Sequence, residues 1–406
     1  MLEQHHKMME SVAITKNGEK VYSRSIGFAN VEKKKKANEK TKYRIGSITK
    51  SFTATVILQL IDEGKLTLNT NLAEFYPEIV NASEITIQQL LNHHSGLFNF
   101  TSAEDYLSIN TKALSKEELL AIIKKNGKAF EPGEKGEYSN TNYLLLTFIS
   151  EDLDKDSFAN ILEKRIFKPL KLKNTQVGEK INSKKNEAFS YSRKMGARKK
   201  EQETHMSIPL GAGNIISTPT DIAKFYTALL EGKLLSPGSL LNMKIFEDSF
   251  GLGLFQLPYN ENRAYGHTGG IDGFLSMAGY FPNEKMAFIL TSNGSSINLN
   301  DVALGVLAIY FKDNYQLPQY EEEVVLSMEI LTSYEGVYGN DTFSLDISVT
   351  NDDGDLMAQA TGQSSFKLTP TSKNTFVFKP AGIKITFKND ILSIEQAEMT
   401  HALTKK

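Results

Sequence analysis

The chain has 406 residues, of which 40% are hydrophobic and 23% are charged, so it is long enough for a large domain and a second one. Its 46 lysine and arginine residues nearly balance 48 aspartate and glutamate residues, and the formal net charge of -2 argues against nucleic acid as the main partner. Cysteine is absent, which excludes disulfides and cysteine-ligated metal sites, and no apolar run is long enough to span a bilayer.

The first predicted elements are two strands, at 11–15 and 21–26, on either side of Asn17 and Gly18. An Asn-Gly pair between two such segments is a strong signal for a two-residue hairpin turn. We expect this hairpin to join strands within 264–293 in one antiparallel sheet.

Two basic clusters, at 33–36 and 193–200, stand out from the balanced charge of the chain. We interpret both as solvated loops. For the second cluster, a rim of the substrate cleft is the alternative.

A long helix is predicted from Ser47 to a left-handed cap at Gly64, because the apolar residues between them recur at helical spacing. In the sequence Ser-Ile-Thr-Lys at its start, Lys50 lies one turn after Ser47 on the same face. Burial would lower the pKa of the Lys50 amine, and the neutral amine would take the proton of the serine hydroxyl, which alone is a weak nucleophile. Ser364 and Lys367 share this spacing without a helical pattern, and we interpret that copy as coincidence.

Tyr138 and Asn140 follow a turn-rich segment and precede the apolar run 143–149, so we expect them in a loop that leads into a buried helix. A positive charge on a nearby lysine would favour the tyrosine anion, which makes Tyr138 a candidate general base or proton relay. Asn140 offers both a donor and an acceptor, which suits it to orient Lys50 and a substrate amide. The alternative is a helix-capping turn with a half-buried tyrosine, and the Tyr-x-Asn spacing recurs at Tyr338.

Helical patterns continue through the middle of the chain, at 116–125, 142–153, 158–167 and 219–230. A His-Ser-Gly triplet that begins at His94 imitates the third motif described next, but it continues as a loop rather than as a strand. We therefore predict a structural role for this histidine and for the histidine before it.

His267, Thr268, Gly269 and Gly270 precede two short apolar runs separated by a turn, as in an antiparallel sheet. A strand that carries threonine and glycine lets a substrate lie against its backbone without obstruction by side chains. The N–H group of Gly270, together with that of Ser47, would form an oxyanion hole. All four residues are therefore candidates for substrate binding.

In this order and spacing, the three motifs resemble those of the serine β-lactamase and D-alanyl-D-alanine carboxypeptidase superfamily. The resemblance is to its class C-like, penicillin-binding-protein-like branch, which also contains esterases. It extends from about residue 10 to residue 312 and includes further matching stretches at 90–97, 211–213 and 217–221.

The resemblance implies that Ser47 is the nucleophile that becomes acylated, with Lys50 as its activator, Tyr138 as the base and Asn140 in a positioning role. We assign the proton transfer jointly to Lys50 and Tyr138, because the base is disputed even in a related class of enzymes. The implied activity is that of a serine hydrolase that acts on peptide, amide, lactam or ester substrates. One alternative is a penicillin-binding sensor or binding protein that is acylated with little turnover, and another is a degenerate scaffold without acylation.

One position departs from the family pattern. In β-lactamases of this branch, the third motif generally begins with a lysine whose charge helps to bind the substrate carboxylate. His267 stands at that position, and an ordinary histidine is only partly charged near neutral pH. Unless Arg263 or a lysine compensates, we expect weak carboxylate anchoring, with esters, small peptides and amides as better substrates than β-lactams.

Beyond a last predicted helix at 298–312, the sequence changes character, and from Tyr334 onward short alternating segments are separated by regular turns. This pattern predicts a small antiparallel barrel or sandwich, similar to the lipocalin-like C-terminal domain of some members of the superfamily. The expected fold class is α+β, with a β-lactamase/transpeptidase-like antiparallel sheet, flanking helices and a helical region, followed by a small all-β barrel-like domain. We predict a hydrolase domain at 1–315, a linker at 316–330 and the β domain at 331–406.

We expect no cofactor and no metal, because the adjacent pairs His5-His6 and His93-His94 lack a carboxylate cluster. The expected partner is a small-molecule or short-peptide substrate, and the oligomeric state is open. The resemblance implies a periplasmic or otherwise exported protein. Residues 1–9 are polar and show no signal peptide, so we interpret them as a trimmed or tagged start, with a cytoplasmic location as the alternative.

Overall fold

The computed structural model describes residues 8–194, 197–294, 297–315, 324, 326–340, 343, 345–378, 381–396 and 399–406. The chain divides into two compact units, one made of Met1–Tyr191 and Lys200–Asn314 and the other of Ser192–Lys199 and Tyr315–Lys406. Because the predicted linker lies mostly outside the described residues, its boundaries stay a prediction. Within the described ranges, no helix has the length and apolar character that crossing a membrane requires.

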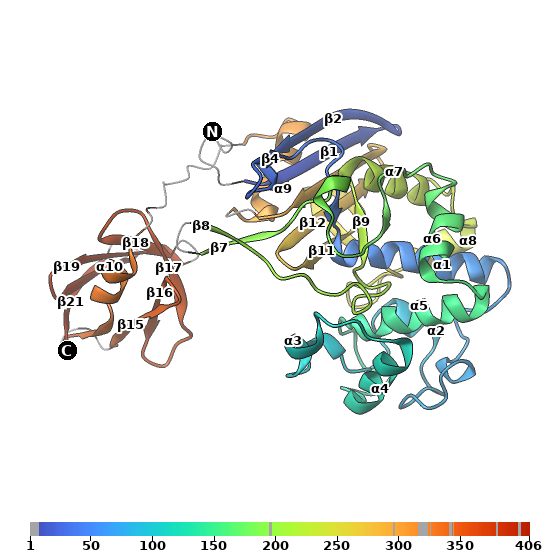
Figure 1. Ribbon diagram of the computed structural model, residues 1–406, viewed down its shortest axis with the longest axis horizontal. Coiled ribbons are helices and arrows are strands. Elements are labelled where there is room, and N and C mark those ends of the chain that lie inside the picture. The colour runs from blue at the N-terminus through green and yellow to red at the C-terminus, as the bar shows by residue number, and fades with distance from the viewer. Residues whose placement is uncertain are drawn as a thin grey trace. The chain divides into compact units, whose positions relative to one another are not determined.

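The first unit is built on a six-stranded antiparallel sheet with the strand order β10-β11-β12-β13-β1-β2 (Figure 1). The N-terminal hairpin pairs with β13, with Glu10 opposite Ser292 and Lys16 opposite Met286. The expectation that this hairpin joins the later strands in one sheet is therefore confirmed. The strands of the sheet are β1 (Glu10–Lys16), β2 (Glu19–Ile26), β10 (Phe255–Tyr259), β11 (Asn262–Ile271), β12 (Phe274–Phe281) and β13 (Met286–Ser292).

The hairpin turn between β1 and β2 needs backbone conformations that few residues tolerate. Asn17 has a φ of 53° and Gly18 a φ of 78°, the left-handed values that a type I′ turn requires at both positions. The tight turn lays β2 along β1 as an exposed edge strand, whereas β1 is buried over most of its length.

Helices cover both faces of the sheet. α7 (Pro219–Leu230) packs on β1, β12 and β13, and it shares a core with Tyr280 of β12. Phe281 points to the opposite face, because side chains alternate along a strand. There it contacts Phe311 of α9 (Leu299–Phe311), with 5.6 Å between the ring centroids. The last predicted helix therefore packs on the sheet, as expected.

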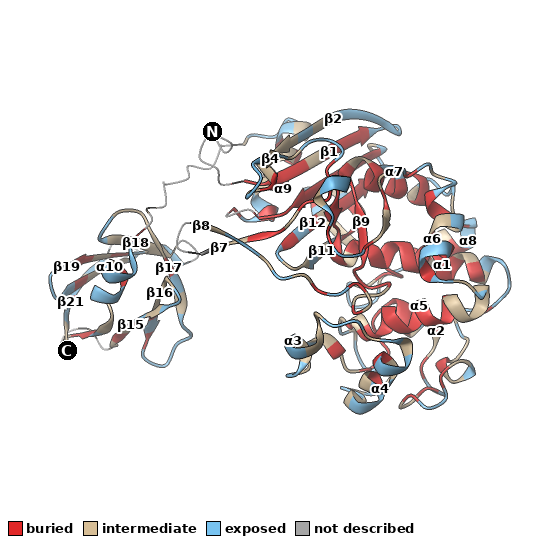
Figure 2. Cartoon of the chain, viewed as in Figure 1, coloured by how far each residue is buried: buried red, intermediate tan, exposed pale blue. Residues whose placement is uncertain are grey.

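A helical region beside the sheet completes the first unit, and its helices α1 and α5 are buried along most of their length (Figure 2). The helices predicted from Ser47, at 116–125 and at 142–153 are present with ends displaced by one or two residues. The helix predicted at 158–167 is shorter and continues as a π-helical turn, Glu163–Phe167. The helices of this region are α1 (Thr49–Asp62), α2 (Ile87–Leu91), α3 (Tyr106–Ile109), α4 (Lys116–Asn126), α5 (Asn140–Asp154), α6 (Phe158–Leu162) and α8 (Pro237–Met243).

Short strands account for the two basic clusters. Lys35–Lys36 forms β4, and the cluster at 193–200 lies on the β7–β8 hairpin, of which residues 195 and 196 lie outside the described part. The interpretation of both clusters as loops is therefore wrong in part. A strand tolerates lysines when their side chains lie in solvent. The short strands are β3 (Phe28–Asn30) with β4 (Lys35–Lys36), β5 (Tyr43–Arg44) with β9 (Ile215–Ser217) and β6 (Gln176–Val177), and β7 (Tyr191–Lys194) with β8 (Ala197–Lys200).

The second unit contains a closed barrel of eight antiparallel strands, preceded by α10 (Met328–Ser333). Closure by pairing of the first strand with the last removes the exposed sheet edges, so the barrel rather than the sandwich is the correct alternative. Buried apolar residues such as Phe376, Ile385 and Leu403 form its core. The strands are β14 (Gly336–Gly339), β15 (Ile347–Asp352), β16 (Asp355–Ala360), β17 (Phe366–Pro370), β18 (Thr375–Phe378), β19 (Ile383–Lys388), β20 (Ile391–Gln396) and β21 (Met399–Lys405).

Candidate active site

Ser47 lies at the entrance to the buried helix α1. It occupies a short 3₁₀ turn, Gly46–Ile48, which runs directly into α1, so the α-helix itself begins two residues later than predicted. Lys50 is in the first turn of α1, and its Nζ atom lies 3.1 Å from Ser47 Oγ. The structure therefore brings the predicted serine and lysine within hydrogen-bonding distance, which suits direct proton transfer.

Two fixed acceptors hold the amine of Lys50 in addition to Ser47. Nζ donates to Oδ1 of Asn140 at 2.7 Å and to the carbonyl oxygen of Ala212 at 2.8 Å. A neutral amine has two N–H groups and one lone pair, and these two oxygens can only accept. They therefore take both N–H groups and leave the lone pair for the hydroxyl of Ser47.

Burial of Lys50 favours this neutral form. Its side chain has 0% exposure, and burial lowers the pKa of the ammonium well below the ordinary value of 10.5, because the charged form loses its hydration. In the described part of the chain, no carboxylate forms an ion pair with Nζ to oppose this effect. Lys50 is thus a buried amine that can act as a base.

Tyr138 lies in the loop before α5, close enough to Ser47 for the serine side chain to lower the pKa of the phenol. The Lys50 Nζ atom is 4.7 Å from the centroid of the Tyr138 ring. Burial raises the pKa of the Tyr138 phenol well above its ordinary value, and the Ser47 side chain opposes this only in part. The prediction that a lysine charge favours the tyrosine anion is wrong, because burial of both groups favours the neutral form of each.

His93 holds the loop that carries Tyr138. Its Nδ1 accepts the backbone N–H of Ser139 at 3.1 Å, and the centroids of the His93 and Tyr138 rings are 4.5 Å apart. Burial lowers the pKa of His93 well below its usual value, so Nδ1 keeps its lone pair for the Ser139 N–H. His93 and the equally buried His94 have the structural role that the sequence predicts.

The third motif runs along β11 beside the nucleophile. A Cβ atom built on Gly46 would lie 2.7 Å from the backbone nitrogen of Gly270, and one built on Gly269 would lie 3.0 Å from the backbone nitrogen of Ser47. These close approaches bring the N–H groups of Ser47 and Gly270 into one region, as an oxyanion hole requires. Thr268 and Gly270 are exposed on the strand, so a substrate can lie along it.

His267 differs from the expectation of partial charge. It is 3% exposed, and its Nδ1 donates to the carbonyl oxygen of Thr268. Burial lowers the pKa of His267 to about 3, so the ring is neutral at physiological pH. Arg263 is exposed and lies four residues away on the same strand, about 13 Å along it. His267 therefore supplies no positive charge for a carboxylate, and Arg263 does not replace it.

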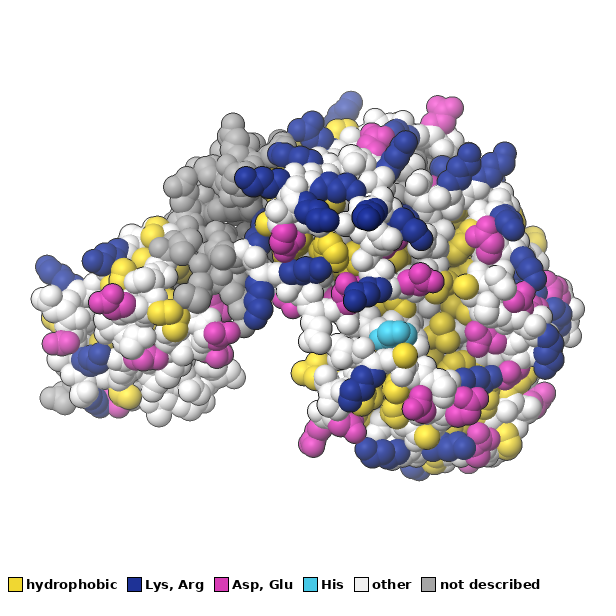
Figure 3. All heavy atoms as spheres, viewed as in Figure 1, with side chains coloured by type: hydrophobic (Ala, Val, Ile, Leu, Met, Phe, Trp, Pro, Cys, Tyr) yellow, Lys and Arg dark blue, Asp and Glu magenta, His cyan; other side chains and the backbone are white. Residues whose placement is uncertain are grey.

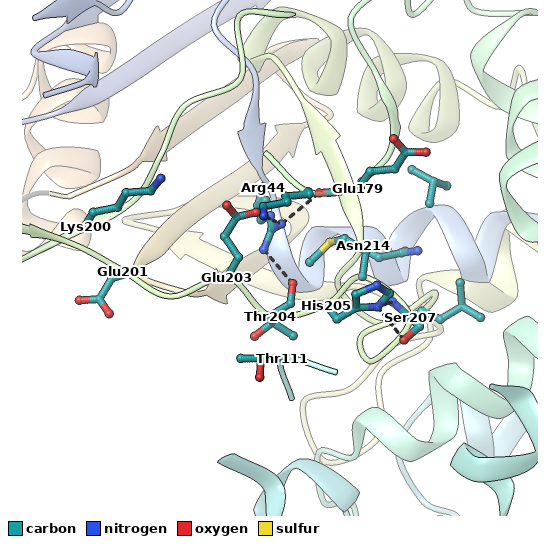
Figure 4. A pocket seen from close by; sticks show the side chains of 15 residues that line it. Arg44, Thr111, Glu179, Lys200, Glu201, Glu203, Thr204, His205, Ser207 and Asn214 are labelled. Carbon is teal, nitrogen blue, oxygen red and sulfur yellow. Dashed lines mark hydrogen bonds and ion pairs between the residues drawn. The ribbon is translucent and has the colours of Figure 1, made fainter. Parts of the chain in front are cut away.

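A buried arginine joins segments that surround the site (Figure 4). Arg44, three residues before Ser47, forms ion pairs with Asp272, which follows β11, and with Glu203 at 2.9 Å. It also donates to the carbonyl oxygen of Thr204 at 3.1 Å. Its side chain is 1% exposed, so it needs these partners to compensate for lost hydration. The network fixes the segment before the nucleophile relative to the end of β11.

A pocket of about 840 Å³ lies beside this network and is within the usual size range of ligand pockets. Apolar residues such as Met206 and Leu210 line it together with the exposed Lys200 (Figure 4). On the same side of the first unit, lysine and arginine side chains gather above exposed apolar ones (Figure 3). One member of the second basic cluster thus lies at a ligand-sized hollow.

The other Ser-x-x-Lys copy has none of these features. Ser364 is exposed ahead of β17, and Lys367 lies within that strand, where it pairs with Asp355 at 2.8 Å on the surface. The interpretation of this copy as coincidence is confirmed.

Several groups that build the site carry no recognisable sequence signal. Asn99 and Thr101 hold the amide of Asn140, and Ala212 contributes only a backbone carbonyl. Arg44 acts through buried partners that are distant in sequence. None of them stands at a spacing that indicates chemistry, although Ala212 falls in a stretch with secondary resemblance to the superfamily.

Comparisons with known proteins identify a family for this chain. A family model described as Beta-lactamase matches residues 6–307. Teichoic acid D-alanine hydrolase of Staphylococcus aureus is 29% identical over 289 residues, which are 70% of this chain and 70% of that protein. The D-amino acid amidase of Ochrobactrum anthropi SV3, complexed with L-phenylalanine amide, has a TM-score of 0.67 and 28% identity, and the match covers 77% of this chain and 97% of that chain. The octameric penicillin-binding protein homologue of Pyrococcus abyssi, at 24% identity, bears on the fold alone, with a TM-score of 0.69 over 99% of this chain and 97% of that chain.

Proposed function

This chain belongs to the β-lactamase family and is a serine hydrolase, and on that premise we propose that Ser47 is the residue that its substrates acylate. The observation that carries the proposal is the buried Lys50 amine, which Asn140 and Ala212 hold beside Ser47 Oγ. The proposed reaction is acyl transfer to water through an ester intermediate on Ser47.

Acylation begins when Ser47 Oγ attacks the carbonyl carbon of the substrate and its proton passes to Lys50 Nζ. Negative charge develops on the carbonyl oxygen, which the N–H groups of Ser47 and Gly270 stabilise. The bond to the leaving group then breaks, and the neutral phenol of Tyr138 donates its proton to that group. A proton transfer from the Lys50 ammonium to the Tyr138 phenolate restores both neutral forms.

Deacylation again uses Lys50 as the base. The Lys50 amine accepts a proton from a water molecule as the water oxygen attacks the acyl carbon. The bond to Ser47 Oγ breaks, Ser47 recovers a proton from Lys50, and the free acid leaves. A base that is neutral before each step can therefore serve both half-reactions.

Tyr138→Phe removes the proposed proton donor, and we expect kcat/KM for an amide to fall by roughly 10²–10⁴. A nitrophenyl ester should lose much less, because nitrophenolate leaves without a proton. Steady-state kinetics on both substrates check this expectation. Equal losses on the amide and the ester, or full activity on the amide, would contradict the role of Tyr138 as proton donor.

Gly269→Ala tests the close approach of β11 to the nucleophile. A methyl group at this position would collide with the carbonyl oxygen of Ile45, so β11 must move away from Ser47. We expect kcat to fall by roughly 10²–10³, the usual cost of losing an oxyanion-hole donor. Gly238→Ala in α8 is the control, because its Cβ would meet nothing nearer than 3.9 Å. Unchanged kcat in Gly269→Ala would exclude this use of the strand.

The substrates that we propose are esters or amides of amino acids and short peptides. Neutral His267 provides no charge for a β-lactam carboxylate, and the relatives named above are a D-alanine hydrolase and a D-amino acid amidase. Within the superfamily we place the chain in the class C-like branch. A penicillin-binding protein that is acylated with little turnover is the second candidate.

A substrate panel separates the candidates. We propose parallel assays with D-amino acid amides, D-alanyl esters, D-Ala-D-Ala peptides, nitrophenyl esters and nitrocefin, after titration of active sites with a fluorescent phosphonate. Product beyond the first equivalent identifies a hydrolase, and product that stops at one equivalent identifies a binding protein. Absence of any covalent adduct on Ser47 would refute the proposal.

We also propose an exported location, in the periplasm or cell envelope. A relative that is named for teichoic acid, a cell-envelope polymer, supports this assignment. Fractionation of the source cells tests it, and recovery of the protein only in the cytoplasm would overturn it.

A further inference from the structure

The amide of Asn140 has two chemically different ends, and its orientation decides what the Lys50 amine meets. Oδ1 faces Lys50 Nζ at 2.7 Å. Nδ2 donates away from the lysine, to Thr101 Oγ1 at 3.0 Å and to Asn99 Oδ1 at 3.3 Å. In this orientation both N–H groups and the oxygen have partners of the correct kind.

A backbone group sets this orientation. The N–H of Asn140, the first residue of α5, donates to Asn99 Oδ1 at 3.0 Å. Because a backbone N–H can only donate, the oxygen end of the Asn99 amide must face it. The Thr101 hydroxyl donates to the same oxygen at 3.0 Å, which leaves the lone pairs of Thr101 for Asn140 Nδ2. Because the Asn140 N–H can only donate, it determines which group donates and which accepts in each hydrogen bond of the series that ends at the Lys50 amine.

The reversed amide would disable the base. It would direct the two N–H donors of Asn140 at Lys50 Nζ and its oxygen at the oxygen of Asn99. A neutral lysine would then spend its lone pair on a hydrogen bond from Asn140 instead of on the Ser47 proton. An ammonium would face a donor in place of an acceptor, which disfavours the charged form.

We propose that Asn99 and Thr101 are positioning residues, which keep the amide oxygen of Asn140 on Lys50 and thereby keep the lysine lone pair free for the Ser47 proton. This inference rests on the proposed function, in which Lys50 is the base. The two residues are well anchored, because the backbone N–H of the buried Phe100 between them donates to Thr141 Oγ1 of α5 at 3.1 Å.

The groups that face the Lys50 amine are neutral, so the acid limb of the pH–rate profile belongs to the lysine. The ring centroids of Tyr138 and Tyr143 lie 4.7 Å and 5.5 Å from Nζ. Burial lowers the pKa of both His93 and His267, so neither ring carries a charge. Around Nζ the described residues include no ion-paired carboxylate.

Thr101→Val tests the inference, because valine has the shape of threonine and cannot accept the bond from Asn140 Nδ2. We expect the plateau of kcat/KM to fall about tenfold, as for the loss of one hydrogen bond, and the acid limb to move to lower pH. Thr101→Ser restores the hydroxyl and should rescue both quantities. A purely structural effect would reduce the amount of active enzyme, measured by phosphonate titration, without moving the limb.

The outcomes are distinct. If the acid limb and the plateau of kcat/KM are unchanged in Thr101→Val, or change equally in the valine and serine variants, the inference is overturned. The proposed function would still stand, because the parent enzyme turns over. Failure of the parent enzyme itself to form an adduct on Ser47 or to release product would instead overturn the proposed function.

Discussion

Ser47→Ala is expected to abolish turnover of every substrate in the panel, with a loss of roughly 10⁴-fold or more, because no other group can form the acyl intermediate. The fold should persist. The alanine removes one hydroxyl, and the Lys50 amine keeps its bonds to Asn140 and Ala212. Intact-mass analysis after treatment with the phosphonate should show no adduct, and the thermal midpoint should stay within a few degrees of the parent value.

The chain supplies its own control for this experiment. Ser364→Ala changes the serine of the coincidental Ser-x-x-Lys copy, which is exposed in the second unit. We expect full activity and full labelling in this variant. Residual turnover in Ser47→Ala that survives repurification and titration would mean that another group is the nucleophile.

Lys50→Ala is expected to lower kcat/KM by roughly 10²–10⁴, as for the loss of an acid–base group. The substitution also leaves Asn140 Oδ1 and the Ala212 carbonyl without their donor, so some loss of stability accompanies the loss of rate. Lys50→Met, which fills the space without a basic nitrogen, separates the two effects. Lys367→Ala removes an exposed lysine of the same local spacing and should leave the rate unchanged.

The pH dependence gives an independent check on Lys50. Burial depresses its pKa below 10.5, so the amine is the active form above that depressed value, and activity falls as pH drops through it and the ammonium forms. The raised pKa of Tyr138 keeps the phenol protonated over the same range. We expect the acid limb in kcat/KM profiles of the parent enzyme to disappear from the residual rate of Lys50→Met. Persistence of the same limb in that variant would assign it to another group.

Local signals in the sequence explain how much of the fold was predictable. The Asn17-Gly18 pair determines a hairpin turn through its own backbone preferences, and the apolar spacing after Ser47 determines a helix. Each of these two signals determines the structure of residues that are only a few positions away in the sequence. By contrast, the strands in the basic clusters pair with near neighbours in the sequence, β4 with β3 and β8 with β7, but the composition of these clusters alone indicates loops.

In the candidate site, too, the residues with a recognisable local signal were predictable, and the features that depend on the folded chain were not. The residues of the three motifs carry side chains whose types announce chemistry, and the structure places them around Ser47. The neutral state of Tyr138 depends on burial, which no motif reports, and the sequence therefore suggested the wrong charge. The carbonyl of Ala212 is a backbone group that any residue would supply. Its contribution depends on where the loop lies, and this is a property of the folded chain.

The position of β1 between β2 and β13 has a consequence for biosynthesis. Residue 16 of β1 pairs with residue 286 of β13. The N-terminal hairpin therefore leaves the ribosome long before β13, the second neighbour of β1, has been synthesised. During that interval one side of β1 is an open edge available to other chains, and the long wait for a distant partner slows completion of the sheet. The hydrolase unit must therefore mature late in translation, and cells that produce it quickly should depend on chaperones that shelter nascent strands.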